Sequence, residues 1–202
     1  PVTIVAIGSS STTGVGASSA RAAYPNRLQA HWTALFPNSP ATVVNQGVNG
    51  EDAQKMMARF ATDVTPFAPD LVLWQLGVNS VLQQNGVASE RGRIDRGIAM
   101  LKATGADVIL IDPQYAARVM VDPDHGDMLR LLADLARQTR VGLFPRFAIM
   151  RHWQTSHQMS AAMMISADGL HLTDLSYDCW AAALATALER ALSAHASAPG
   201  HR

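Results

Sequence analysis

The sequence changes character near its start, in the stretch IVAIGSSSTTG (residues 4–14). Residues 4–7 are apolar and mostly β-branched, which is typical of a strand buried on both faces of a parallel sheet. Gly8 ends this run, and consecutive hydroxyl residues follow before a helical pattern begins. A serine directly after such a strand lies at the carboxyl edge of the sheet, where open α/β folds bind their ligands. Ser10 is therefore a candidate functional residue, although Ser/Gly clusters after strands are also ordinary loops.

The rest of the chain repeats this alternation of strand and helix. Further strands are predicted at residues 42–45, 71–76, 108–111 and 141–144. Helices with one apolar face are predicted at residues 24–36, 51–61, 87–104, 127–140 and 177–194. Residues 150–166 are predicted to be a loop or short helix, and residues 196–202 a frayed tail. Strands that alternate with helices form a parallel sheet covered on both faces, so we expect one α/β domain over residues 1–202.

Composition and charge argue against several classes of protein. The formal net charge is zero and there is no run of lysine or arginine, which disfavours nucleic acid or an anionic membrane as a partner. Apolar runs stay well below the length of about 18 residues that a membrane span needs. The single cysteine, Cys179, excludes an internal disulfide and a cysteine-based metal cluster. The compartment stays open: the bacterial cytoplasm, or the periplasm or exterior if a signal peptide was removed before Pro1.

Polar residues and glycines follow the predicted strands at the points where the chain leaves the sheet. They are Ser10 after the first strand, Gly47 and Asn49 after the second, Asn79 after the third, and Gln114 and Tyr115 after the fourth. Because the carboxyl ends of parallel strands meet at one edge of a sheet, we expect these residues to gather there.

Asp168 and His171 supply the chemistry that a serine lacks. A hydroxyl is a poor nucleophile until a base removes its proton. The spacing of three residues lets the Asp168 carboxylate turn back and accept a hydrogen bond from His171 Nδ1. His171 Nε2 is then free to act as general base toward Ser10. The alternative is that Asp168 only caps a turn.

Attack by a serine on a carbonyl creates an oxyanion that needs hydrogen-bond donors. Candidate donors are the backbone N–H groups of Ser10 and Gly47 and the side-chain amide of Asn79. A glycine at position 47 allows close approach of the backbone to substrate. Asn79 also has an ordinary alternative, since asparagine often satisfies backbone groups in loops.

Taken together, four motifs resemble those of the SGNH hydrolases, also called the GDSL esterase/lipase family. The motifs are Gly8-Ser9-Ser10, residues 45–50 with Gly47, Gly77-Val78-Asn79, and Asp168-Gly169-Leu170-His171. The resemblance implies a flavodoxin-like three-layer α/β/α sandwich with a five-stranded parallel sheet. It also implies a Ser10–His171–Asp168 triad, an oxyanion hole formed by Ser10, Gly47 and Asn79, and an enzyme that uses no cofactor or metal.

The chain departs from the family pattern at two positions. Ser9 stands where the family has an aspartate before the nucleophile, and Ser80 stands where an aspartate follows the block III asparagine. Neither position belongs to the implied triad or oxyanion hole. A shift of one residue in the first motif would make Ser9 or Ser11 the nucleophile in place of Ser10.

The resemblance implies an esterase that acts on a small-molecule or carbohydrate ester. A chain of this length with few insertions favours a shallow groove and short acyl groups, in particular acetyl. Candidate substrate contacts are Gln114, Tyr115, Trp153 and Met164, each of which also suits loop or core packing. His152, His157 and His171 lack the helical spacing of a zinc site.

Other functions remain open at this point. An acyltransferase would use the same triad with an acceptor other than water. A non-catalytic, carbohydrate-binding relative would keep the fold alone. A flavin-binding protein would use residues 9–14 to cradle phosphate, but this interpretation leaves Asn79, Asp168 and His171 without a role. The oligomeric state is not predicted.

Overall fold

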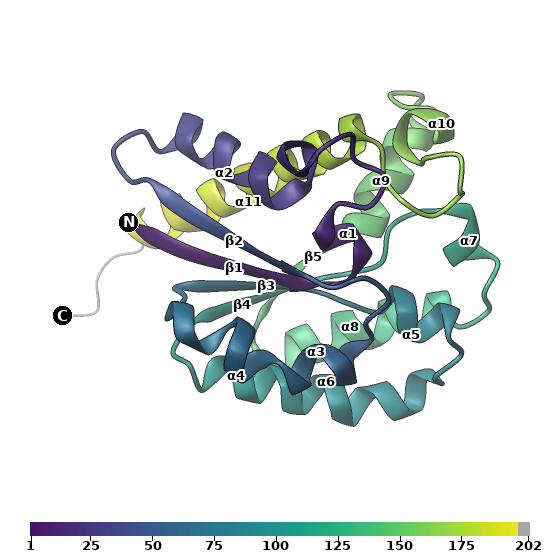
Figure 1. Ribbon diagram of the computed structural model, residues 1–202, viewed down its shortest axis with the longest axis horizontal. Helices are drawn as coiled ribbons and strands as arrows, with labels where there is room; N and C mark the ends of the chain where they lie inside the picture. The colour runs from purple at the N-terminus through teal and green to yellow at the C-terminus, as the bar shows by residue number, and fades with distance from the viewer. Residues whose placement is uncertain (198–202) are drawn as a thin grey trace.

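In residues 1–197, which the computed structural model describes, five parallel strands form one sheet in the order β2-β1-β3-β4-β5 (Figure 1). The strands are β1 Val2–Gly8, β2 Ala41–Gly47, β3 Leu71–Gln75, β4 Asp107–Ile111 and β5 Gly142–Phe144. This order is the flavodoxin-like one. The predicted α/β sandwich with a five-stranded parallel sheet is therefore confirmed.

Helices cover both faces of the sheet (Figure 1). One face carries α2 Tyr24–Leu35, α9 Arg146–Thr155 and α11 Asp174–Ser197. The other carries α3 Ala53–Ala58, α4 Phe60–Asp63, α6 Val87–Lys102 and α8 His125–Thr139. The short helices are α1 Ser10–Thr13, α5 Val78–Leu82, α7 Ala117–Met120 and α10 Ala161–Met164, with 3₁₀ turns at Ala20–Ala22 and Thr65–Phe67.

The alternation of side chains along β1 explains why the sheet needs both layers. Ile4 and Ala6 are buried in the core beneath α2 and α11, whereas Val5 and Ile7 are buried in the core against α3, α6 and α8. All four side chains are fully buried. Burying one large apolar side chain contributes about 1.5–3 kcal/mol, so the apolar run of β1 alone favours the three-layer arrangement strongly.

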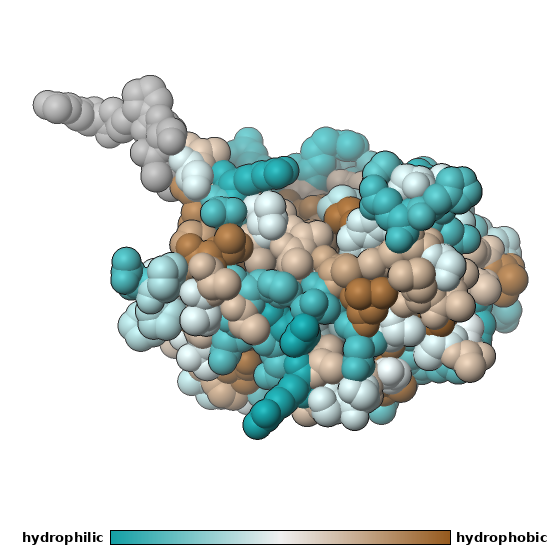
Figure 2. All heavy atoms as spheres, turned by 90° about the horizontal axis from the view of Figure 1, so that it is seen from above, coloured by the Kyte–Doolittle hydropathy of each residue, from teal (hydrophilic) through white to brown (hydrophobic). Residues whose placement is uncertain are grey.

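One face of the molecule is seen in Figure 2, coloured by hydropathy. Seen over α2, α9 and α11, hydrophobic side chains lie in separate groups among hydrophilic ones (Figure 2). Among the described residues, no helix combines the length and the apolar character needed to span a membrane.

Several predicted boundaries differ from the structure. The helix predicted at residues 51–61 is divided into α3 and α4, because Arg59 leaves helical geometry with φ −112° and ψ 11°. Residues 150–166, predicted to be a loop or short helix, contain the end of α9, which begins directly after Pro145, and the short helix α10. The inward face of α9 is formed by residues 146, 147 and 150, one of which is an arginine, so the apolar periodicity is weak. Of the predicted frayed tail, residues 196 and 197 belong to α11, and residues 198–202 lie outside the described part.

The carboxyl ends of the strands lie together at one edge of the sheet, on the right in Figure 1, where α1, α5 and α7 begin. This edge is where ligands bind in open α/β sheets. The candidate residues that follow the strands are found here.

Candidate active site

Ser10 opens α1, the single helical turn that directly follows β1. The carbonyl of Ser9 accepts hydrogen bonds from the N–H groups of Thr12 (2.9 Å) and Thr13 (3.0 Å), which closes the turn. Ser10 Oγ lies 3.0 Å from His171 Nε2. Ser9 and Ser11 are 2% and 1% exposed, whereas Ser10 is partly exposed. Of the three consecutive serines, Ser10 is therefore the one whose hydroxyl reaches the imidazole.

The turn at residues 166–171 brings Asp168 back onto His171. The N–H of Ser166 donates to the carbonyl of His171 (2.8 Å), and Gly169 has a φ of +72°, which glycine adopts without strain. Asp168 Oδ2 lies 2.5 Å from His171 Nδ1. Together with the Ser10 contact, this places the three side chains in the order that the motif spacing predicts.

Asp168 is held as a carboxylate. Burial raises its pKa, but hydrogen bonds from the His171 imidazole, the N–H groups of His171 and Leu170 and the Ser166 hydroxyl outweigh burial. The pKa of Asp168 is therefore well below its usual range. A carboxylate that stays ionised favours the His171 tautomer with a proton on Nδ1, which leaves Nε2 as the acceptor that faces Ser10.

Gln75, at the end of β3, holds the turn that carries Ser10 through hydrogen bonds to Ser9 and Thr12. It is fully buried, and its Oε1 accepts from the Ser9 N–H (3.0 Å), the Ser9 hydroxyl (3.1 Å) and the Thr12 hydroxyl (3.2 Å). A Cβ on Gly8 would lie 2.1 Å from Thr12 Oγ1 and 2.9 Å from Gln75, so this close packing requires glycine. The sequence-based predictions did not include Gln75. The available signal was an amide at the last position of an otherwise apolar strand.

Asn79 lies in the first turn of α5, after Gly77, whose φ is +94°. One hydrogen of its side-chain amide is donated to the carbonyl of Glu51 (2.8 Å). This contact orients the amide and leaves its second hydrogen for another acceptor.

Gly47 does not offer its N–H in this structure, which corrects the predicted set of donors. That N–H donates to Asn45 Oδ1 (3.0 Å). A Cβ on Gly47 would lie 2.2 Å from the backbone nitrogen of Thr13, so this glycine serves the close contact between β2 and α1.

Gly50, at the end of the same loop, has a φ of +77°. Its N–H has no hydrogen-bond partner among the described residues, and open space surrounds the place that a Cβ would take there, with no atom within 4 Å. The Gly50 carbonyl accepts a hydrogen bond from the Gln83 side chain (3.0 Å). The next residue is Glu51, whose carbonyl holds the Asn79 amide. Gly50 therefore presents a free donor close to the segment that orients the Asn79 amide.

Two of the predicted substrate contacts, Gln114 and Met164, are wrong, because both side chains are buried. Met164 is fully buried in the core beneath α11. Gln114 is 1% exposed, donates to the carbonyl of Leu170 (3.1 Å) and accepts from Arg146 Nη2 (2.8 Å). Gln114 therefore supports the turn that carries His171. Trp153 is partly buried against the same core as Met164.

Tyr115 remains accessible. It packs edge-on against Phe147 (5.1 Å between ring centroids) and lines a hollow of about 620 Å³ beside the turn of Asp168. The other lining residues include Ala116, Met120 and Gly169, and no charged side chain is among them.

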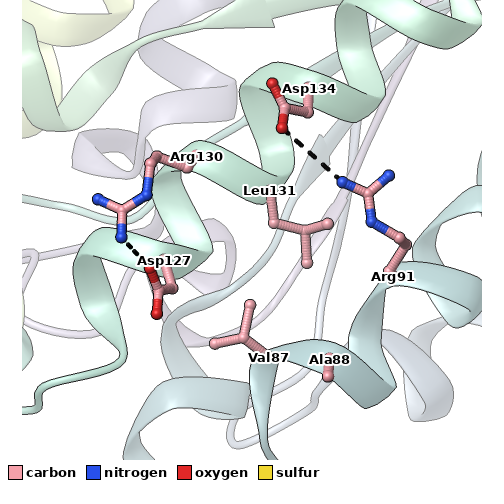
Figure 3. Close-up of a pocket in the computed structure, with 7 residues that line it drawn as sticks. All are labelled: Val87, Ala88, Arg91, Asp127, Arg130, Leu131 and Asp134. Carbon is pink, nitrogen blue, oxygen red and sulfur yellow. Dashed lines mark hydrogen bonds and ion pairs between the residues drawn. The ribbon is translucent and has the colours of Figure 1, made fainter.

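Another hollow, of about 380 Å³, lies between α6 and α8 (Figure 3). It is bordered by the ion pairs Arg91–Asp134 and Arg130–Asp127 and holds none of the predicted site residues. Exposed pairs of this kind contribute little to stability by themselves.

The zinc alternative has no support from side-chain positions. Within the described residues, no three histidine, cysteine, aspartate or glutamate side chains come together as a metal site would require. His152 and His157 are exposed, while His171 contacts Asp168 and Ser10.

Asp112, which directly follows β4, predicts a pH-dependent stability. Burial raises its pKa to about 7, although the Phe147 N–H and the Arg146 charge favour the carboxylate. Its ordinary value is 3.8, so folding favours the protonated acid. The stability that this group contributes is complete below its unfolded pKa and is lost as the pH rises through about 7.

We therefore expect Asp112→Asn to raise the free energy of unfolding relative to wild type at about pH 8 and to change it little at about pH 4, where the native acid is also neutral. Asparagine keeps an oxygen for the Phe147 N–H. Urea denaturation across this pH range measures the effect, with Asp134→Asn, at a partly exposed position, as control. A difference that does not grow with pH contradicts the prediction.

Comparison with known proteins identifies the family to which the chain belongs. A model of the Non-GDSL lipase-like family matches residues 1–194. An arylesterase from Vibrio mimicus is 26% identical over 161 residues, covering 74% of each chain. A lipase/acylhydrolase from Enterococcus faecalis superposes with a TM-score of 0.78 at 19% identity, covering 94% of this chain and 96% of the other. An acetylxylan esterase from Geobacillus stearothermophilus, solved as a catalytic mutant, gives a TM-score of 0.76 at 18% identity, covering 93% of each chain. On this evidence the chain belongs to the Non-GDSL lipase-like family and is a carboxylic ester hydrolase of the GDSL/SGNH-like type.

Proposed function

We propose that this protein is an SGNH-type serine esterase that hydrolyses short-chain esters, in particular acetyl esters, through an acyl-enzyme on Ser10. The observation that carries the proposal is the continuous contact from Ser10 Oγ to His171 Nε2 (3.0 Å) and from His171 Nδ1 to Asp168 (2.5 Å). A base within this distance of a hydroxyl is the arrangement that nucleophilic catalysis by serine requires.

In the first half of the reaction, His171 Nε2 takes the proton of Ser10 as Oγ attacks the ester carbonyl carbon. The carbonyl π electrons move to the oxygen, which becomes an oxyanion. When this intermediate collapses, the bond to the alcohol oxygen breaks and His171 returns the proton to the leaving group. Asp168 stabilises the imidazolium that exists between these two proton transfers.

In the second half, water takes the place of the alcohol. His171 removes a proton from water, the resulting hydroxide attacks the acyl carbon, and Ser10 Oγ leaves with the proton from His171. The products are the free acid and the original enzyme.

For the oxyanion we propose three donors: the N–H of Ser10, the second amide hydrogen of Asn79, and the N–H of Gly50 in place of Gly47. The Gly50 N–H has no partner among the described residues and neighbours the segment that holds Asn79, whereas the Gly47 N–H already donates to Asn45. Donors already in place gain most from the charge that develops in the transition state.

Support for a short acyl group comes from the relatives. One structural neighbour is an acetylxylan esterase, and another is a two-domain esterase active on acetylated mannans. The accessible hollow beside Tyr115 lies next to the Asp168 turn and offers room for part of a substrate. We therefore propose an acetylated carbohydrate or a small acetyl ester as the substrate.

The test is hydrolysis of p-nitrophenyl esters from acetate to decanoate, followed by acetyl release from acetylated xylooligosaccharides. We expect kcat/KM to be highest for acetate or butyrate and to fall with chain length. Preference for decanoate would contradict the short-chain assignment. Ester formation on an added alcohol, faster than hydrolysis, would instead establish an acyltransferase.

A further inference from the structure

Arg59 lies outside the candidate active site but contacts the segment that leads to Ser10 and the segment that holds the Asn79 amide. It lies between α3 and α4, with its side chain 13% exposed. Its Nη2 donates to the carbonyls of Gly8 (3.2 Å) and Gln46 (2.9 Å), at the carboxyl ends of β1 and β2. Its Nε donates to Glu51 Oε2 (2.6 Å), and its Nη1 to Asp63 Oδ2 (2.8 Å).

The contact with Gly8 bears on the nucleophile. The Gly8 carbonyl and the Ser9 N–H belong to one planar peptide unit. Arg59 holds this unit by its oxygen, and Gln75 holds it by its N–H (3.0 Å). The Gly8 carbonyl also accepts the Val48 N–H (3.0 Å). Ser10 is the next residue, so Arg59 and Gln75, together with this backbone contact, hold the direction in which the turn leaves β1.

The contact with Glu51 bears on the oxyanion donors. Glu51 follows Gly50, and its carbonyl accepts the Asn79 amide (2.8 Å). The ion pair with Arg59 is mostly enclosed, since the Glu51 side chain is only 14% exposed. An enclosed, charge-assisted hydrogen bond restrains this segment more firmly than a surface pair would.

The geometry requires arginine. A guanidinium presents several N–H donors in one rigid plane, and here three of its nitrogens serve two carbonyls and two carboxylates. A lysine ammonium is a single flexible point charge and cannot span these four acceptors together.

We infer that Arg59 is a positioning residue that sets Ser10 against the oxyanion donors Asn79 and Gly50. The inference rests on the proposed function. Arg59 touches no substrate in this role; it acts through Gly8 and Glu51. Misplaced donors stabilise the transition state less while they leave ground-state binding nearly intact, so the effect belongs in kcat rather than KM.

The experiment compares Arg59→Met, Arg59→Lys and Arg59→Ala with wild type on p-nitrophenyl acetate. We expect Arg59→Met to lower kcat by about 100-fold, on the scale of one lost oxyanion contact, with KM within about 3-fold of wild type. Arg59→Lys should recover only a small part of the loss. Millimolar guanidinium should restore part of the activity of Arg59→Ala and leave wild type unchanged.

Two control variants separate positioning from general stability. Asp63→Asn removes the charge of an Arg59 partner that has no contact with the site but keeps an acceptor oxygen, and Arg137→Met removes an exposed arginine paired with Asp134 at 2.8 Å. Both should keep wild-type kcat. Circular dichroism and the melting temperature establish that each variant is folded. If Arg59→Met does not fold, the Arg59→Lys kinetics and the guanidinium response of Arg59→Ala decide the matter.

The inference is overturned if Arg59→Met is folded and its kcat is within about 2-fold of wild type, or if the variant changes only KM. It is also overturned if Asp63→Asn lowers kcat equally. If Arg59→Met is unfolded, the absence of a guanidinium response in Arg59→Ala overturns it. These outcomes differ from failure of the proposed function. In that case Ser10→Ala would keep the activity of wild type, whatever Arg59 does.

Discussion

Replacing Ser10 with alanine is expected to lower kcat/KM for p-nitrophenyl acetate by at least about 10⁴-fold, because removal of a serine nucleophile leaves only binding and oxyanion stabilisation. His171→Ala should lose a similar amount, since the serine hydroxyl is not deprotonated without its base. The double variant should be little worse than either single one, because the two residues act as a unit. Initial rates at matched protein concentration measure this.

The neighbouring serines provide matched controls. Ser9→Ala removes the hydroxyl that donates to Gln75, and Ser11→Ala removes a buried hydroxyl beside the nucleophile. Each should cost about 1 kcal/mol of stability and leave most of the activity. If Ser10→Ala keeps its activity while Ser9→Ala or Ser11→Ala loses it, the nucleophile has been assigned to the wrong serine. If all three variants remain as active as wild type, the proposed mechanism is wrong.

Asn79→Ala has the second largest expected effect. Loss of one donor to an oxyanion lowers kcat by about 10²–10³-fold in a serine hydrolase, and a similar loss is expected here with little change in KM. The Asn79 amide is held by the Glu51 carbonyl at 2.8 Å, so its free hydrogen is already oriented in the unliganded enzyme. Steady-state kinetics on p-nitrophenyl acetate measures kcat and KM separately.

Asn85→Ala is the control for this variant. Asn85 lies shortly after α5 and also donates its side-chain amide, in this case to Asp52 (3.2 Å), but it contacts none of the proposed catalytic groups. It should keep kcat within about 2-fold of wild type, because its partly buried side chain is bonded to Asp52 and not to a catalytic group. Equal losses in the two variants would mean that disturbance of α5, and not loss of an oxyanion donor, explains the effect of Asn79→Ala.

The parts of the site that local sequence specifies were predictable. Ser10 follows a buried strand by two residues, and the turn that joins Asp168 to His171 is closed by hydrogen bonds within six residues. Period, turn chemistry and short spacing are properties of consecutive residues, so the pattern of the chain predicts them. The order of strand and helix likewise predicted the layered α/β sandwich, since strands that are apolar on both faces need a layer of helices on each side.

The remaining contacts depend on segments that only folding brings together. Gln75 meets Ser9 across 66 residues, and Arg59 meets Gly8 across 51. The same holds for the errors. Gln114 and Met164 were predicted to meet substrate, but the packing of α9 and α11 buries them. The exception is Gly47, whose N–H donates to the side chain of nearby Asn45, a local contact.

Sequence alone thus determined the elements of the fold and the candidate nucleophile with its acid–base pair, because strand period, turn chemistry and motif spacing are local. The tertiary structure decided which polar groups face the substrate, because hydrogen-bond partners and burial are set by neighbours that lie far away along the chain.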